Sequence, residues 1–356
     1  MVLLSAEENG FSDGATAYKV IEKHNVSVAT NGGFFNRGKY GDPGFFEKLK
    51  EKFWDTPGVT GYAFPCSILI TNGKLLSDVS HYLPAVGINK NGEIKFGEVK
   101  VVWYASCSKN GSKFILDRFS EIDHETTNAV IYYQDENKNI TEVSLSGNKV
   151  TNIQPVLETD IVADKKPNSF YVHNPSANMI SELKSLNQGD DISITYELKA
   201  AVYTEVGEAN SEDNELSVFF NNCPYVVSGG QLLMYNGAVD PRSTKMYAGR
   251  GRVYDIFGTA ICIHKNKNQV SIIVDKTKGT TGGRIPKDAF IKLLENENCD
   301  QVMSLDGGGS STMITKIDGK YDEVGNRRVI SDILAVMPHE ELSAVVSDVS
   351  HKSSDL

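Results

Sequence analysis

The pattern of hydrophobic and polar positions predicts a dense region of strands over residues 67–198, after a long loop at residues 36–62 that is rich in Gly, Pro and aromatic residues. Two hairpins are predicted at residues 67–76 and 85–96, because an Asn-Gly pair separates two apolar runs in each. Helical spacing of apolar residues predicts short helices at residues 14–24 and 181–186. Further strands are expected at residues 26–29, 99–104, 129–133, 140–145 and 192–198.

The last third changes its pattern. Strands are predicted at residues 259–264, 270–275 and 301–305, with a helix from Pro286 to Asn298 that buries Ile291, Leu293 and Leu294. A β–β–α–β succession implies a mixed sheet with a helix packed on it. We therefore expect an α/β (α+β) fold, a compact mixed β-sheet domain with a few packed helices.

Domain organisation is expected to be simple. No internal repeat and no Gly/Ser linker interrupts the chain, so a single domain over residues 1–350 is the simplest interpretation. Residues 351–356 are polar and are expected to form a disordered tail.

Composition is that of an ordinary globular protein, with 40% hydrophobic and 23% charged residues. The formal net charge of −10 argues against a nucleic-acid groove, because such surfaces are basic, yet a few arginines and amides suffice for one phosphate. We see no signal peptide and no run long enough to span a membrane. A soluble chain in the cytoplasm or in a virus particle is expected, and the oligomeric state stays open.

The cysteines and histidines show no metal-binding pattern. The five cysteines include no C-x-x-C pair, so neither a zinc site nor a full disulfide framework is expected. Cys262 lies inside an apolar run and is interpreted as a small core residue. We expect no required cofactor, and a divalent cation such as Ca²⁺ would have to bind without a dedicated ligand cluster.

The sharpest candidate for chemistry is a glycine-rich turn that directly follows the strand at residues 301–305. Successive glycines let the backbone approach a ligand closely, and their N–H groups form an anion-binding nest with nearby hydroxyls. Asp306 would lie at the rim of the sheet beside those donors. A carboxylate next to an anion-binding turn is electrostatically unfavourable, so its presence there indicates a functional role. The alternative interpretation is a flexible surface turn. The motif reads Asp306, Gly307, Gly308, Gly309, Ser310, Ser311.

Weaker candidates also follow predicted strands. Asn31 offers both a donor and an acceptor before two glycines, although a hairpin or bulge is the commoner explanation. Asp275 and Arg284 flank a predicted helix start, which suits an anion, although a turn residue and a solvated charge would look the same. Arg328, paired with Arg327, could bind a phosphate, although a surface salt bridge is the commoner fate.

Taken together and in order, these motifs resemble those of the phosphodiester glycosidase family. One such motif is weak evidence, whereas the ordered set is specific. The resemblance spans residues 14–337 and is loose in a divergent, β-rich portion at residues 98–215. It rests on Asn31-Gly32-Gly33-Phe34-Phe35, residues 67–73, Gly229-Gly230-Gln231-Leu232-Leu233 with Asn236-Gly237, Gly258-Thr259-Ala260-Ile261, Val274-Asp275, Gly282-Gly283, residues 305–313, and Arg328 with Ser331.

The resemblance implies a hydrolase that cleaves the glycosidic bond of a sugar-1-phosphodiester and releases free sugar and a phosphomonoester. It also implies a compact fold whose glycine-rich turns cluster at one edge. By position, Asp306 and Asp275 would be the catalytic carboxylates, with the base and nucleophile roles left open. The residues expected to bind substrate are Asn31, Gly32, Gly33, Gly307, Gly308, Gly309, Ser310, Ser311, Arg284 and Arg328.

One position departs from the family pattern. Gly258 stands where members usually carry an Arg before the Thr-Ala pair, and that Arg could bind the phosphate. Arg250 and Arg252 lie a few residues earlier and are candidate substitutes. The departure motivates an alternative, a non-catalytic module that binds a phospho-sugar polymer or a nucleotide-like phosphodiester as a virion or surface component.

Overall fold

The protein forms two compact units, which we call unit 1 (Met1–Lys100 with Lys199–Ser350) and unit 2 (Val101–Leu198). Whether they unfold together as the single domain expected over residues 1–350 stays a prediction. The predicted tail lies outside the described residues. The computed structural model describes residues 1–5, 14–33, 35–37, 63–65, 67–109, 111–120, 122–123, 126–163, 166, 168–202, 212–240, 258–266, 269–274, 287–307, 310–325 and 329–338.

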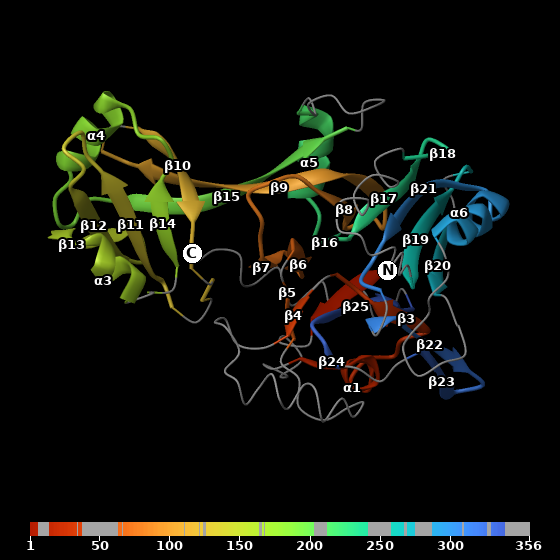
Figure 1. Ribbon diagram of the computed structural model, residues 1–356. Coiled ribbons are helices and arrows are strands. Elements are labelled where there is room, and N and C mark those ends of the chain that lie inside the picture. Colours follow the sequence, from red (N-terminus) through yellow and green to blue (C-terminus); the bar gives the residue numbers. More distant parts are fainter. Residues whose placement is uncertain are drawn as a thin grey trace. The chain divides into compact units, whose positions relative to one another are not determined.

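The first sheet of unit 1 interleaves strands from the two ends of the chain (Figure 1). The N-terminal run is wholly buried as β1, against the main hydrophobic core. The short α1 (Ala17–Ile21) packs its Val20 and Ile21 into the same core. In spatial order the strands are β1 (Val2–Ser5), β25 (Asp332–Val336), β3 (Val28–Asn31), β22 (Thr312–Ile317) and β23 (Lys320–Gly325), and two short pairs join β2 (Ala15–Thr16) to β24 (Val329–Ile330) and β4 (Phe35–Arg37) to β5 (Ala63–Pro65).

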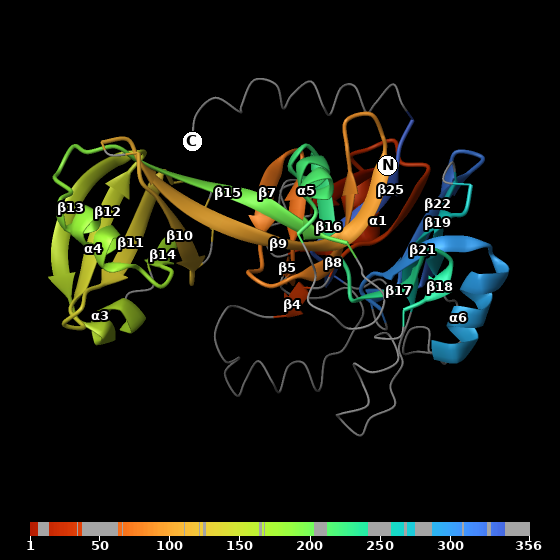
Figure 2. The same ribbon diagram turned by 90° about the horizontal axis from the view of Figure 1, so that it is seen from above.

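The second sheet of unit 1 carries the predicted strands of the last third. Figure 2 shows α6 (Lys287–Asn296) against this sheet, and Phe290 and Leu294 pack on it. Leu293, expected in the buried face, is 39% exposed because Phe290 takes its place. The strands, in order, are β18 (Ala238–Val239), β17 (Gln231–Tyr235), β21 (Cys299–Ser304), β19 (Thr259–His264) and β20 (Val270–Val274).

This sheet is antiparallel, and the prediction of a mixed sheet from the β–β–α–β succession was wrong here. β21 returns on the far side of β19 from β20, so the two strands that run in the same direction are not neighbours. The local pattern gives the order of elements but not which edge of β19 receives the returning strand.

The two predicted hairpins are confirmed in unit 1. Asn72 and Gly73 both have positive φ, which the tight turn between β6 and β7 requires. The strands are β6 (Leu69–Thr71), β7 (Lys74–Ser77), β8 (Leu83–Ile88), the start of β9 (Ile94–Cys107), and β16 (Tyr225–Ser228) between β6 and β8. Helix α5 (Asn214–Asn221) begins at Asp213, whose side chain accepts a hydrogen bond from Leu216 N.

Unit 2 is a strand-rich body with one helix on each face of its sheet. Ile161 of α3 packs against Val130 and Tyr132, whereas Leu183 of α4 joins Ile131 on the opposite face. β11 and β14 pair in parallel. The elements are β10 (Lys113–Arg118), β11 (Asn128–Gln134), β12 (Ile140–Ser146), β13 (Lys149–Val156), α3 (Glu158–Ala163), β14 (Ser169–Val172), α4 (Ala177–Lys184) and β15 (Ile192–Ala201), which pairs with β9.

The fold class is therefore right only in part. Strands far outnumber helices among the described residues, so the protein is more sheet-rich than an even α/β mix. The short alternating runs account for this, because most strands lie in antiparallel hairpins and few connections need a helix.

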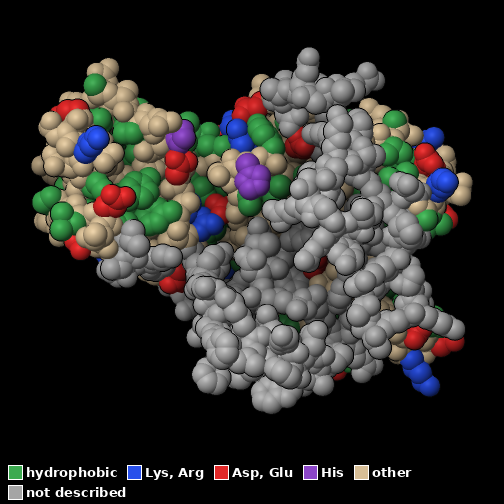
Figure 3. Space-filling model, viewed as in Figure 1, with side chains coloured by type: hydrophobic (Ala, Val, Ile, Leu, Met, Phe, Trp, Pro, Cys, Tyr) green, Lys and Arg blue, Asp and Glu red, His purple; other side chains and the backbone are tan. Residues whose placement is uncertain are grey.

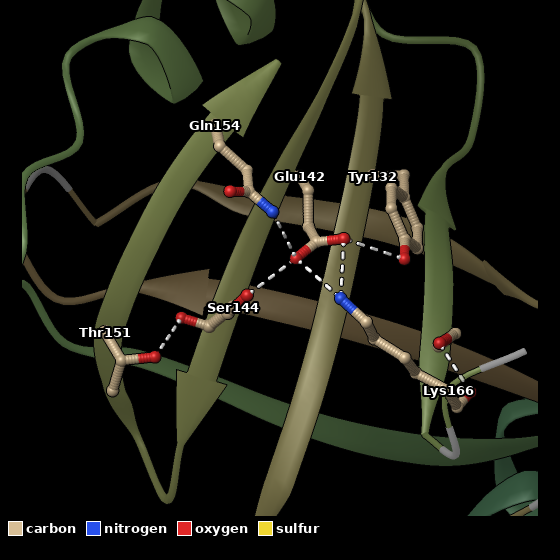
Figure 4. A network of polar contacts seen from close by, with 7 residues as sticks. Tyr132, Glu142, Ser144, Thr151, Gln154 and Lys166 are labelled. Carbon is tan, nitrogen blue, oxygen red and sulfur yellow. Dashed lines mark hydrogen bonds and ion pairs between the residues drawn. The ribbon is translucent and has the colours of Figure 1, made fainter. Parts of the chain in front are cut away.

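A buried carboxylate ties three strands of unit 2 together (Figure 4). Glu142 of β12 is 3% exposed. Lys166 Nζ lies 2.9 Å from both of its oxygens, and hydrogen bonds come from Ser144 Oγ (2.9 Å), Tyr132 OH (3.1 Å) and Gln154 Nε2 (3.4 Å). Burial by itself would raise the pKa of Glu142, but these donors and the lysine charge outweigh it and hold the pKa below its usual value.

We expect Glu142→Gln to lower the free energy of unfolding by roughly 1–3 kcal/mol at neutral pH, because the donors lose a charged acceptor. A folded-state pKa below the unfolded value means that this stability is present above the unfolded pKa and is lost as pH falls through the folded pKa. The difference between parent and variant in urea denaturation should therefore shrink in acid.

Glu136→Gln is the matched control, because Glu136 makes an exposed pair with Lys184 in the same unit. Its urea midpoint should equal that of the parent. Equal midpoints for the parent and Glu142→Gln at neutral pH would contradict a stabilising role for the network.

Candidate functional site

Asn31, the last residue of β3, joins segments that are distant in sequence. It is 1% exposed. Its Nδ2 donates to the backbone oxygen of Asp306 (2.5 Å), and its Oδ1 accepts from Thr259 Oγ1 (2.8 Å) and from the backbone N–H of Thr312 (3.2 Å). The ends of β3 and β21 and the beginnings of β19 and β22 therefore meet at one point of unit 1. Because its oxygen is already engaged, Asn31 is placed to fix the glycine-rich turn.

The two glycines after Asn31 lie against a second buried carboxylate, Asp332 of β25. Gly32 N donates to the backbone oxygen of Asp332 (3.0 Å), and Gly33 N donates to its Oδ2 (2.9 Å). The Ser331 hydroxyl donates to Oδ1 (2.5 Å). Burial raises the pKa of Asp332, and the hydrogen bonds from Ser331 and Gly33 oppose that rise.

Sequence reasoning missed Asp332. The signal that could have found it is a carboxylate inside a run at residues 329–336 that is otherwise apolar except for Ser331. Buried carboxylates rarely occur without partners, so such a residue in a strand calls for a donor from elsewhere in the fold. Only the structure shows that the donor is the backbone of the Gly32-Gly33 turn.

The turn after β21 is held through its backbone. Asp306 N donates to Gly32 O (3.1 Å), Gly307 N donates to Asp306 Oδ1 (2.9 Å), and Ser310 N donates to Gly307 O (3.1 Å). Ser310 and Ser311 are buried, whereas Asp306 is only half-buried. The carboxylate therefore lies on a turn whose shape is set by hydrogen bonds of the main chain.

Two hydroxyls beside this turn lack a hydrogen-bond partner among the described residues, those of Ser311 and Thr312. Both side chains are buried. Leaving a buried polar group unpaired costs on the order of 1–3 kcal/mol, so each such group calls for an explanation. A bound ligand with acceptor oxygens would supply partners for both hydroxyls.

A second pair of glycines lies beside the same strand end. Gly230 N donates to Ser304 O (2.8 Å), and a Cβ on Gly229 would lie 2.2 Å from that oxygen. A Cβ on Gly33 would lie 3.0 Å from Ser228 O. The pairs Gly32-Gly33 and Gly229-Gly230 thus let three backbone segments approach one another closely.

The structure brings together seven of the residues predicted for the site, Asn31, Gly32, Gly33, Asp306, Gly307, Ser310 and Ser311. Gly258, the position expected to depart from the family pattern, is buried directly before Thr259, which contacts Asn31. The roles of all these residues stay predictions. The predicted site residues that lie outside the described residues are Asp275, Arg284, Gly308, Gly309 and Arg328.

The described residues show neither a basic patch on the face drawn in Figure 3 nor a cluster of metal ligands. On the face drawn in Figure 3, lysine and arginine side chains are scattered among acidic ones. The described residues contain no group of three or more His, Cys, Asp or Glu that could hold a metal ion, and the expectation about a divalent cation stays a prediction. No helix in the described ranges has the length and apolar character needed to cross a membrane.

A disulfide joins Cys262 of β19 to Cys299 of β21, the strands that lead to Thr259 and Asp306. Cys262 is a buried core residue, as its sequence context predicts, but the bond itself was missed. The two cysteines are 37 residues apart and carry no spacing signal. Only the antiparallel pairing of β19 with β21 brings their Cα atoms to 5.8 Å.

Closing a 37-residue loop should contribute about 4 kcal/mol to the free energy of unfolding. We therefore expect a reductant to lower the urea midpoint of the parent and to leave that of the double variant Cys262→Ala/Cys299→Ala unchanged. Thiol titration of the denatured, unreduced protein should count three free thiols, the five cysteines less the bonded two. Five free thiols would contradict the bond.

Comparisons with known proteins agree with this architecture. The phosphodiester glycosidase family model matches residues 142–337, more than half of the chain. The chain belongs to the phosphodiester glycosidase family. No curated protein matches it significantly. The match begins within unit 2, so the Asn31 motif lies outside it.

Solved structures are similar to this chain at 14% sequence identity, which shows the fold alone. A hypothetical protein from Synechocystis has a TM-score of 0.59 over 95% of this chain and 56% of its own length, so this chain spans little more than half of that relative. A putative exported protein from Burkholderia pseudomallei has a TM-score of 0.50, over 95% of this chain and 71% of that one. The catalytic domain of zebrafish N-acetylglucosamine-1-phosphodiester alpha-N-acetylglucosaminidase, auto-inhibited by its pro-peptide, has a TM-score of 0.44, over 95% and 73%.

Proposed function

We propose that the protein hydrolyses the glycosidic bond of a sugar-1-phosphodiester. Water adds to the anomeric carbon, the bond from that carbon to the phosphate oxygen breaks, and free sugar and a phosphomonoester leave. One observation supports this beyond family membership. The half-buried Asp306 lies on a turn fixed by Asn31, which also accepts from the backbone N–H of Thr312. The buried hydroxyls of Ser311 and Thr312 lack a partner among the described residues.

The proposed roles follow from the charges that develop in this reaction. A phosphate is a good leaving group, so the departing oxygen needs little acid assistance. Backbone amides of the glycine-rich turn, with Ser310 and Ser311, would hold the phosphate. The Asp306 carboxylate would face the anomeric carbon and stabilise an oxocarbenium-like transition state, or act there as base or nucleophile.

Other residues complete the proposal. Asp275 is the second choice for the catalytic carboxylate. Arg284 and Arg328 would add phosphate contacts, because a guanidinium binds phosphate oxygens bidentately. Asn31, Gly32 and Gly33 would hold the turn in place, since Asn31 bonds the Asp306 backbone and Gly32 O accepts from Asp306 N.

A turnover screen tests the proposal. The purified chain is incubated with a panel of sugar-1-phosphodiesters that includes wall teichoic fragments, and free sugar and new phosphomonoester are both quantified. Equimolar release of the two products is expected, and Asp306→Asn should release them more slowly by orders of magnitude. Release from neither protein, with saturable binding intact, would replace hydrolysis by the second candidate function.

That second candidate is a non-catalytic module that binds a phospho-sugar polymer or a nucleotide-like phosphodiester. Gly258 is the observation that favours it, because it is buried next to Thr259, at the position where an Arg of the family pattern could bind the phosphate. Such a module would show saturable binding and no released sugar. Gly258→Arg would then be expected to tighten binding of the phosphodiester.

We also propose an oxidising location for the chain. Of the two places expected from the sequence, the cytoplasm and a virus particle, the disulfide between Cys262 and Cys299 favours the particle, because cytosolic thiols are kept reduced. Trapping the thiols by alkylation at the moment of lysis tests this: a reduced pair in its native setting would refute it.

A further inference from the structure

Gln231, the first residue of β17, buries a side-chain amide that has no partner among the described residues. The residue is 4% exposed, and both Nε2 and Oε1 lack a hydrogen bond there. Its backbone, in contrast, is fixed. Gln231 N donates to Ser304 Oγ (2.9 Å), and that hydroxyl lies 3.3 Å from Gln231 O. The backbone of Gln231 is therefore fixed, whereas the polar atoms of its buried side chain have no partner among the described residues.

Such an arrangement points to a ligand. Native proteins pair almost all buried polar groups, because an unpaired amide gives up its bonds to water without compensation. A carboxamide offers N–H donors and an acceptor oxygen side by side. A sugar hydroxyl is its natural complement, since one hydroxyl both donates and accepts and neighbouring ring oxygens accept as well.

The strand pairing places Gln231 near Asp306. Gln231 lies opposite Ser304 in the β17–β21 pair, and Asp306 follows Ser304 by two residues. Leu232 and Met303 point into the main core, so strand alternation places Gln231 and Ser304 on the other face. Paired residues lie about 5 Å apart and alternate residues about 7 Å, so the Gln231 backbone is within roughly 10 Å of Asp306.

We propose that Gln231 is a specificity-determining residue that binds ring hydroxyls of the sugar whose anomeric carbon faces Asp306. This assignment rests on the proposed function, because it places the sugar at Asp306. The phosphate would take the glycine-rich turn and its hydroxyls, and the sugar ring would extend toward β17. The hydrogen bonds of Gln231 would then select sugars by the positions of their hydroxyls.

The test combines one change in the protein with one change in the substrate, as in a double-mutant cycle. The parent and Gln231→Met, which keeps the side-chain length and removes the hydrogen bonds, are measured with a hexose-1-phosphate glycerol diester and with its monodeoxy analogues. Both kcat/KM and Kd are determined. For one analogue, we expect the kcat/KM of the parent to be at least tenfold lower than with the full sugar, because a site built for a hydroxyl penalises its absence. The kcat/KM of Gln231→Met should fall less than threefold with the same analogue.

Gln301→Met is the matched control, since Gln301 lies near the opposite end of β21 in the same sheet. It should keep the deoxy penalty of the parent. We also expect Gln231→Met to raise the melting temperature, because it removes a buried amide without a partner. A structural role for Gln231 would instead lower the melting temperature.

The outcomes separate this inference from the proposed function. A tenfold penalty seen in Kd without any turnover would support the role of Gln231 and overturn hydrolysis. Normal turnover with equal deoxy penalties in the parent and Gln231→Met, for every analogue, would overturn the role of Gln231 and leave hydrolysis standing.

Discussion

Replacing Asp306 by asparagine is expected to remove most turnover and to leave the fold intact. The contacts that hold this residue in place are made largely by its backbone, which donates to Gly32 O and accepts from Asn31 Nδ2. The asparagine oxygen can still accept the hydrogen bond from Gly307 N that Asp306 Oδ1 accepts now. The change deletes one negative charge and keeps this hydrogen bond.

That charge is what the proposed reaction needs. A base, a nucleophile or an oxocarbenium stabiliser must be a carboxylate, so its loss should lower kcat by orders of magnitude. Ligand affinity should fall much less, or rise, because the phosphate of the ligand no longer faces a neighbouring carboxylate. Melting temperature, Kd and kcat are measured on one preparation of each protein.

Asp318→Asn serves as the control, because Asp318 lies exposed in the turn between β22 and β23 of the same unit. It removes the same charge and should leave kcat, Kd and melting temperature as in the parent. If Asp306→Asn turns over like the parent, Asp306 is not catalytic, and Asp275 becomes the next residue to test.

Replacing Gly32 by alanine should damage both the fold and the site. A Cβ on Gly32 would lie 1.8 Å from Asp332 Oδ2 and 2.8 Å from its Cγ. Asp332 has no room to yield, because it is buried and bonded to Gly33 N and Ser331 Oγ. Relieving the clash requires breaking those bonds, so we expect a loss of about 3 kcal/mol or more in the free energy of unfolding.

The same substitution should also lower turnover, because Gly32 O holds Asp306 N. Gly319→Ala is the control: Gly319 has φ +77°, and a Cβ there meets nothing within 4 Å. It should cost only about 1 kcal/mol, the strain of a left-handed residue. Because the clash is with one side chain, Gly32→Ala combined with Asp332→Ala should destabilise less than the sum of the single changes. If the destabilisations of the two single variants simply add, the clash with Asp332 is not the cause of the loss of stability.

The sequence by itself determined the elements whose signals are local. The Asn72-Gly73 hairpin formed as predicted, because a tight turn depends on the two residues within it. The strands β19 and β20 and the helix α6 also formed near their predicted bounds, since apolar periodicity reports burial within one element. The ordered glycine motifs indicated the family, and the glycine-rich turn at Asp306 was found from the apolar strand before it.

Only the tertiary structure decided which of these elements meet. The contact from Asn31 to Asp306 spans 275 positions of the chain, and that from Gly33 to Asp332 spans 299. No local pattern encodes such pairings, because they depend on which sheet edge receives each returning strand. The same long-range pairing brought Cys262 to Cys299 and paired Gln231 with Ser304, two residues before Asp306. Residue types indicated the candidate groups, and strand pairing decided which of them lie together.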